Sequence, residues 1–137
     1  MPYVLGGMLT TAVMTMKPSD SMTELMRRYA ILRQYLIQTG EFSVLHKESN
    51  IIGMSTKSKD GVGYNIGKGY EIYICTSGDM NSIMHVFIHE LAHNTVTEYD
   101  HSDKFWNNLK RLKTIAKRLG IYEYTPVQPF CNGTIGD

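Results

Sequence analysis

The sequence predicts a single domain of the α+β class, with a scaffold helix, a small mixed sheet and two further helices. Three observations support this prediction. Apolar residues recur at three- and four-residue steps over 21–39, β-branched and aromatic residues fill 70–76, and two capped helical patterns cover 80–96 and 103–119. The 137 residues suit one hydrophobic core.

The composition is that of a globular protein. Hydrophobic residues make up 42% of the chain and charged residues 20%, which excludes a disordered chain, and the net charge of +1 identifies no partner. Two cysteines, Cys75 and Cys131, do not make a disulfide framework. We therefore expect free thiols in a reducing, intracellular compartment, the nucleus or the cytoplasm.

Residues 1–16 carry no charge, and we define an apolar leader over 1–18. The run is shorter than the ~20 apolar residues of a spanning helix, and it lacks the basic start of a signal peptide. Three interpretations remain: a disordered segment, an element packed on the core, or the stub of a membrane anchor. We favour the first two, and we assign residues 19–137 to the domain itself.

The first helix is expected over 21–39, with Gly40 at its end and a capping residue before it, among Ser19, Asp20 and Ser21. Its apolar stripe indicates a scaffold helix that packs on the core: Met22, Leu25, Met26, Tyr29, Leu32, Leu36.

Short apolar runs at 42–45 and 51–54 are expected to be strands, and 62–67 and 70–76 carry the clearest β signal. The tail after residue 121 is expected to be an irregular segment packed on the core.

The motif His89-Glu90-Leu91-Ala92-His93 lies in the helix expected at 80–96, for which Asp79 is a suitable N-cap. A spacing of four residues places both imidazoles on one helix face, where they can bind one zinc ion. Glu90 then lies where the general base for a zinc-activated water is needed. The apolar flanks favour this interpretation over a chance pattern on a solvated face, because buried His and Glu need partners.

A catalytic zinc site needs a third protein ligand if one position is to stay open for water. His101, eight residues after His93 and directly before a new helix, is the preferred candidate. Three carboxylates compete with it: Glu98, Asp100, Asp103. His85 is one turn before His89 and is expected in the core or beside a ligand.

The segments His89–Asn94 and His101–Trp106 resemble the WLM-domain metallopeptidases, which are relatives of the SprT-like (Spartan-like) proteases. The similarity extends to Lys68–Cys75 and to the tail, and it is greatest to the compact versions found in large DNA viruses and some algae. The resemblance implies a zincin-like (gluzincin-like) fold and a zinc-dependent peptidase of an intracellular setting, including a virus-infected cell. Carried over by position, the base is Glu90 and the zinc ligands are His89, His93, His101.

In zincin-type peptidases an edge strand beside the active site pairs with extended substrate. By position, Tyr70–Thr76 is the candidate for this strand, with Tyr70, Ile72 and Ile74 as substrate-binding residues. A tyrosine is a candidate to stabilise the oxyanion, and the sequence does not choose among four of them: Tyr64, Tyr99, Tyr122, Tyr124.

The helix at 103–119 is rich in basic residues. Its cations fit a solvated face, on which positive charges are favourable near the C-terminal end of the helix dipole. They equally fit a surface that binds nucleic acid. The candidate nucleic-acid-binding residues are Lys110, Arg111, Lys113, Lys117, Arg118.

These patterns lead us to expect a monomeric zinc metalloendopeptidase that acts on protein or peptide substrates. The better-studied relatives cleave proteins crosslinked to DNA, so the resemblance extends the expectation to DNA-associated substrates, to DNA as a partner and to DNA repair. The alternative is a non-catalytic DNA-binding or interaction module with a structural zinc. A third hypothesis, a membrane-anchored protease, depends entirely on residues 1–16.

Overall fold

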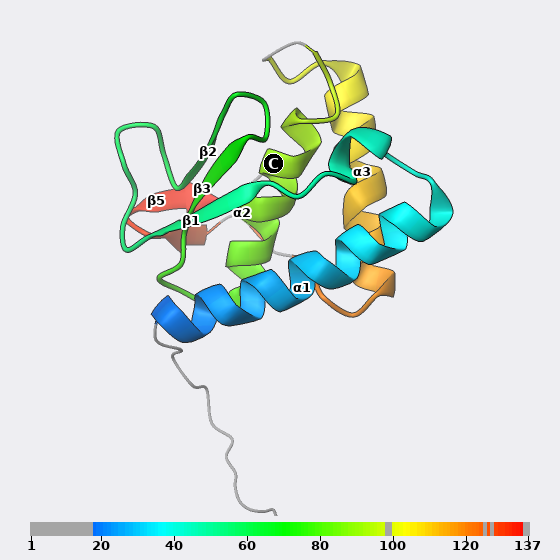
Figure 1. Cartoon of the computed structure of the whole chain (residues 1–137). Helices are drawn as coiled ribbons and strands as arrows, with labels where there is room; N and C mark the ends of the chain where they lie inside the picture. The colour runs from blue at the N-terminus through cyan, green and yellow to red at the C-terminus, as the bar shows by residue number, and fades with distance from the viewer. Residues whose placement is uncertain (1–17, 98–99, 125, 127, 136–137) are drawn as a thin grey trace, which may run out of the picture.

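The computed structural model describes residues 18–97, 100–124, 126 and 128–135. Within them, three α-helices and a three-stranded sheet form the predicted α+β domain, and a two-stranded hairpin follows the last helix (Figure 1). The leader expected over 1–18 lies outside the described residues except for Pro18.

Helix α1 covers Pro18–Thr39 and so begins three residues before the expected start. Proline is favourable in a first helical turn because its missing N–H has no partner there. The residues expected to precede the helix as caps therefore lie inside it: Ser19, Asp20, Ser21. Gly40 ends the helix as expected, with φ of +78° and its N–H donated to the Leu36 carbonyl at 2.9 Å.

The sheet has the strand order β1–β3–β2, with β1 parallel and β2 antiparallel to the central strand. The strands are β1 (Asn50–Met54), β2 (Gly63–Ile66) and β3 (Glu71–Cys75). The prediction that Tyr70–Thr76 forms an edge strand is therefore wrong. Its apolar, β-branched composition reflects a strand that is paired on both sides and buried.

Two other local predictions are also wrong. Residues 42–45 do not form a strand, because Ser43–Leu45 is a short 3₁₀ helix, η2, entered through Phe42 with φ of +49°. The tail is not irregular throughout, because β4 (Gln128–Phe130) and β5 (Gly133–Ile135) pair as an antiparallel hairpin.

The expectation of free thiols is contradicted as well. Cys75, the last residue of β3, forms a disulfide with Cys131, 56 residues further along the chain. The bond ties the tail hairpin to the end of the central strand.

Helix α2 (Met80–His93) begins at the predicted cap, Asp79, and helix α3 (Asp103–Arg118) begins after the cap Ser102. The Asp79 carboxylate accepts the backbone N–H of Ser82 at 2.9 Å, and the Ser102 hydroxyl accepts that of Phe105 at 3.2 Å. Helix α2 ends three residues before the expected position 96. Its last turn therefore places the second histidine of the motif directly at the helix end.

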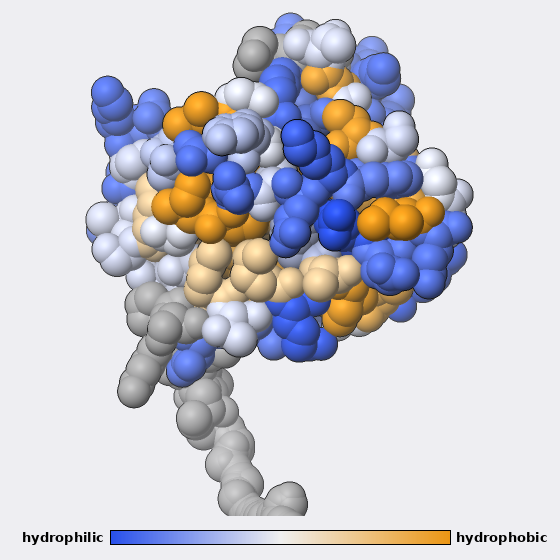
Figure 2. Space-filling view, in the orientation of Figure 1, coloured by the Kyte–Doolittle hydropathy of each residue, from blue (hydrophilic) through white to orange (hydrophobic). Residues whose placement is uncertain are grey.

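Helix α2 lies at the centre of the molecule and contacts α1, α3 and the strands β2 and β3 (Figure 1). Phe87 and Ile88 on α2 are fully buried, and the Phe87 ring packs against that of Tyr29 of α1 in a T-shaped contact with ring centroids 5.0 Å apart. Figure 2 shows hydrophobic side chains in separate patches between hydrophilic ones on the viewed face. Among the described residues, no helix combines the length and hydrophobicity that crossing a bilayer requires.

Candidate metal centre and catalytic site

Three histidine side chains meet at the end of α2. His89 and His93 lie one turn apart on that helix, and His101 lies just before α3. The three rings can each offer one nitrogen such that all three nitrogens lie within 4.8 Å of one another. The Nε2 atoms of His93 and His101 are 3.1 Å apart.

This arrangement fits a single zinc ion. Zinc–nitrogen bonds of ~2.0–2.1 Å at tetrahedral angles separate two ligand nitrogens by about 3.3 Å, close to the distance between His93 and His101. Burial lowers the pKa of His93 to about 4, and the charges of His101 and Lys68 contribute to the same shift. The ring is therefore neutral at pH 7, which is the form that binds metal.

Phe105 contacts all three histidine rings. Its ring centroid lies 4.5 Å from that of His93, 4.6 Å from that of His101 and 5.1 Å from that of His89. Phe105 is fully buried, and the Ser102 cap fixes the turn that presents His101. The sequence indicated Phe105 only as part of an apolar stripe, because nothing in the local pattern shows what that stripe packs against.

The competing ligands do not join this cluster. Asp100 and Asp103 are exposed and outside the group, and Glu98 lies outside the described residues. Cys75 and Cys131 are joined to each other and so offer no thiolate. Among the described His, Cys, Asp and Glu residues, the cluster thus has three members, which leaves a fourth position without a protein side chain of these types.

Glu90 is buried, with 7% of its surface exposed, and a side chain of β2 holds it. The Asn65 amide nitrogen donates to Glu90 Oε1 at 2.7 Å and to the Glu90 backbone carbonyl at 3.1 Å. Burial raises the pKa of Glu90 to about 7, while the hydrogen bond from Asn65 acts in the opposite direction. Sequence reasoning missed Asn65, since one polar residue in a short strand carries no distinctive signal.

A cleft of about 240 Å³ opens between β2 and α2, and it is lined by Gly63, Tyr64, Asn65, Lys68, Glu90, His93. Lys68 closes one side, where its ammonium donates to the His93 backbone carbonyl at 3.0 Å. A Cβ at Gly63 would lie 2.5 Å from a Val86 methyl carbon, so only glycine lets β2 approach α2 this closely.

The other predicted site residues are distributed around the domain. Ile72 and Ile74 are 0% exposed inside the paired central strand, so neither can bind an added strand, while Tyr70 is 67% exposed beyond the strand end. Of the four tyrosine candidates, Tyr64 lines the cleft. Tyr122 is buried, and its hydroxyl lies 3.0 Å from Nδ1 of His85. His85 lies in the core, which is one of the two positions expected for it. Tyr99 lies outside the described residues.

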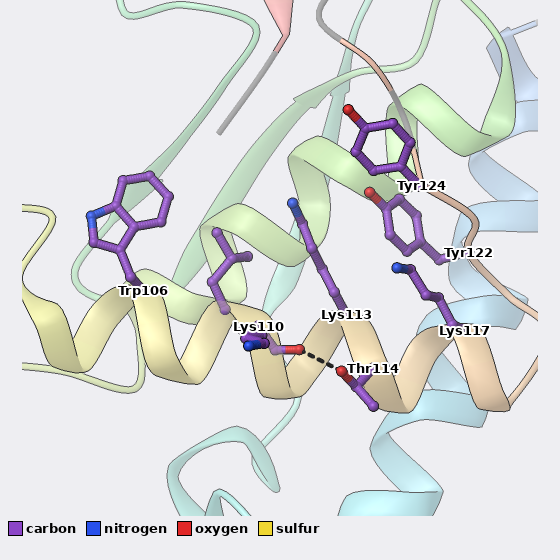
Figure 3. A pocket seen from close by; sticks show the side chains of 8 residues that line it. Trp106, Lys110, Lys113, Thr114, Lys117, Tyr122 and Tyr124 are labelled. Atoms are coloured by element: carbon purple, nitrogen blue, oxygen red, sulfur yellow. Dashed lines mark hydrogen bonds between the residues drawn. The ribbon is translucent and has the colours of Figure 1, made fainter.

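The predicted basic residues of α3 separate into two groups. Lys110, Lys113 and Lys117 line a second groove, of about 350 Å³, together with Trp106, Tyr122 and Tyr124 (Figure 3). Arg111 instead forms a two-pronged ion pair with Glu41, both bonds being 2.9 Å long. Arg118 is exposed and does not line the groove.

The fold and the histidine cluster define the class of protein: a single α+β domain that carries a candidate metal site. The profile of the WLM domain family matches residues 8–131, so the chain belongs to the WLM domain family, a metallopeptidase-like family.

The chain is also similar to a viral protein and to two solved structures. "Uncharacterized protein 136R" of Invertebrate iridescent virus 6 is 33% identical over 101 residues, which cover 67% of this chain and 54% of that protein. The chain thus spans about half the length of this relative. The crystal structure of Wss1 from Saccharomyces cerevisiae is similar with a TM-score of 0.58 at 23% identity, covering 77% of this chain and 84% of that one. A Wss1 mutant gives a TM-score of 0.57 at 21% identity, covering 80% and 87%. These structures support the fold.

Proposed function

We propose that the protein is a zinc-dependent metalloendopeptidase in which His89, His93 and His101 hold the metal and Glu90 is the general base. One observation carries the proposal: three imidazole nitrogens converge beside a buried carboxylate that is not part of the ligand cluster. When bound, zinc supplies a Lewis acid that lowers the pKa of water toward about 7.

The residues of the cleft then have separate roles. Glu90 accepts the proton of the attacking water and later delivers it to the leaving amine nitrogen. Asn65 holds Glu90 Oε1 in place. Tyr64 is the tyrosine of the cleft and the candidate donor to the developing oxyanion.

The substrate class that fits the cleft is an extended peptide. In the described part of the chain, β2 is paired on one side only, with β3, and its other side lies beside the cleft. An extended peptide can add to such an edge through backbone hydrogen bonds. We therefore move the proposed substrate strand from Tyr70–Thr76 to Gly63–Ile66.

Cleavage of an unfolded protein such as casein by the zinc-loaded chain tests the proposal. Wild type should cleave, and Glu90→Gln should lose at least ~100-fold in rate because general base catalysis is removed, while it keeps its zinc. If Glu90→Gln cleaved at the wild-type rate, another group would be the base. If wild type were inactive but bound zinc through a fourth side chain, the alternative of a structural zinc module would replace the peptidase.

We also propose that a single DNA strand is a partner and occupies the groove along α3. Its three lysines supply the positive charge that phosphates need, and Tyr124, 72% exposed, offers a ring on which a base can stack. Figure 3 shows Lys113 between Trp106 and the two tyrosines. The groove starts at the metal centre, because the Trp106 ring lies 5.2 Å from that of His101.

Fluorescence anisotropy with a labelled oligothymidine tests this partner. Changing Lys113 to Ala should weaken binding and reduce the slope of its salt dependence by about one, because one lysine fewer then neutralises a phosphate. Arg118→Ala removes the same charge from the same helix outside the groove and is the matched control. Equal losses of affinity in both variants would mean that binding depends on the overall charge of the helix and not on the groove.

A further inference from the structure

We propose that Asn65 couples substrate binding to the catalytic base: its backbone binds the extended peptide, and its side chain holds Glu90 in position. The inference rests on the proposed peptidase function and assigns to Asn65 a role as a positioning residue. It follows from two independent sets of contacts, one of the strand and one of the side chain.

The first set concerns the backbone of β2. The Cys75 N–H donates to the Val62 carbonyl at 2.9 Å, and two residues further along the ladder Tyr64 lies opposite Tyr73. In an antiparallel pair, residues alternate between those that bond to the neighbouring strand and those that point away from it. Val62 and Tyr64 therefore bond toward β3, and Gly63 and Asn65 direct their N–H and C=O groups toward the open side.

The second set concerns the Asn65 amide. Both of its contacts on α2 are acceptors, the Glu90 carboxylate at 2.7 Å and the Glu90 carbonyl at 3.1 Å. Only the NH₂ side of an amide can donate to them, so the network fixes the orientation of the side chain. The same residue thus presents its backbone to a bound peptide and its amide to the base.

The carbonyl oxygen of the Asn65 amide lowers the stability of the fold. Asn65 Oδ1 is buried and has no hydrogen-bond partner among the described residues. A buried acceptor without a partner destabilises a protein, so the two hydrogen bonds to Glu90 are made at a cost in free energy at Oδ1. A residue that costs stability while it holds a buried carboxylate is typical of a functional site.

The hydrogen bond also leaves Glu90 one oxygen for chemistry. Asn65 engages Oε1, and within the described chain no bond is made to Oε2. Oε2 is therefore the oxygen that can receive and return the proton. Without Asn65, the carboxylate would be free to rotate, and this oxygen would no longer be held toward the cleft.

Asn65→Leu tests the inference, because leucine is close in size and cannot donate. We expect kcat to fall about 10- to 100-fold, KM to change less than about threefold, and zinc content to stay at the wild-type level. The unfolding midpoint in urea should fall modestly, because leucine removes the unpaired Oδ1 but leaves two acceptors of Glu90 without their donor. Asn65→Asp, which places a carboxylate against that of Glu90, should lose activity more severely. Unchanged kcat in Asn65→Leu, or a loss that follows zinc or folding, would overturn the proposal.

Asn81 provides the matched control. This asparagine of α2 also makes two bonds to a distant segment, donating to the Glu123 carbonyl at 2.8 Å and accepting its N–H at 2.7 Å. Asn81→Leu removes a tie between segments that is remote from the cleft. It should lower the unfolding midpoint and leave kcat of the folded protein unchanged, whereas Asn65→Leu should lower kcat by more than its unfolded fraction explains.

Two further measurements separate this inference from the proposed function. In metal-free protein, the side-chain amide resonances of Asn65 should shift in Glu90→Gln, whether or not the protein cleaves anything; no shift would overturn the contact. In a scan of substrate peptides N-methylated at single positions, alternate positions should raise KM, and a uniform response would overturn the backbone role. If wild type lacks peptidase activity while the resonances do shift, the proposed function fails and Asn65 is only a tie between β2 and α2.

Discussion

Helices α1 and α2 contact each other in the core, yet they differ in where they place their charged and titratable residues. On α1 the charged residues face outward, and Glu24 pairs with Arg27 and Arg28 at 2.7 Å each. On α2 two titratable residues are buried, His85 and Glu90, each beside a partner from another segment of the chain. Apolar periodicity is enough to explain α1. The buried polar groups of α2 cost free energy and indicate a site.

Removing a core side chain of α1 should have the largest effect on stability and none on the site. Leu32→Ala deletes a fully buried side chain and should cost ~2–5 kcal/mol of unfolding free energy. Because α1 contributes packing and no ligand, zinc affinity of the folded variant should stay unchanged. Urea unfolding and zinc titration measure the two quantities. Ile37→Ala, on the 41% exposed side of the same helix, is the control and should stay within ~0.5 kcal/mol.

A disulfide links Cys75, shortly before α2, to the tail, and α1 has no such link. Removing the disulfide therefore tests how far the stability around α2 depends on the tail. Replacing both Cys75 and Cys131 with Ser should cost ~2–4 kcal/mol, because the bond closes a loop of 56 residues in the unfolded chain. The same loss should appear in wild type on adding a reductant. A variant as stable as the oxidised protein would mean that the two thiols are free in solution, as the sequence alone suggested.

Helices α1 and α2 also differ in N-terminal capping, which contributes less to stability than the core or the disulfide. The Asp79 carboxylate accepts the N–H and the hydroxyl of Ser82, at 2.9 and 2.7 Å. Asp79→Ala should cost ~1 kcal/mol, measured by thermal or urea unfolding. Ser19→Ala is the counterpart on α1 and should cost less, since Ser19 lies inside the helix. Equal costs would mean that Asp79 does not act as a cap.

The smallest effect is expected on the outer face of α1. The hydrogen bonds from Arg27 and then Arg28 lower the pKa of Glu24 to about 2, so its contribution to stability is present above the ordinary pKa of 4.5 and is lost as the pH falls toward 2. Glu24 is partly exposed and Arg27 is exposed, so solvent screens the pair and Glu24→Gln should cost only ~0.3–0.5 kcal/mol at pH 7. Unfolding curves of variant and wild type should approach each other as the pH falls toward 2. A difference that persisted at still lower pH would have a cause other than charge.

Much of the fold could be predicted because its helices carry their own signals. The stripe of α1, the caps Asp79 and Ser102, and the spacing of the histidine motif are all local in sequence. Strand order is not local: composition identifies β3 as a strand but does not show that β1 and β2 flank it. The buried, paired residues Ile72 and Ile74 gave a strong strand signal for the same reason that they cannot bind substrate.

The candidate site was predictable to the same extent. His89 and His93 share a helix face, so their proximity follows from spacing, and the structure adds His101 to them. The contacts of Asn65 and Phe105 depend on how β2 and α3 pack on α2, which no local pattern contains. The disulfide depends on the tail in the same way, since Cys131 meets Cys75 only after the hairpin folds back.

The central claim is that α2 carries a metal site with a separate base, and metal content tests it most directly. Purified wild type, His89→Ala, His101→Ala and Glu90→Gln would be analysed together by mass spectrometry for bound zinc. We predict one zinc per chain in wild type and in Glu90→Gln, and loss of zinc from both histidine variants. Wild type without metal, or full retention of zinc in His101→Ala, would contradict the claim.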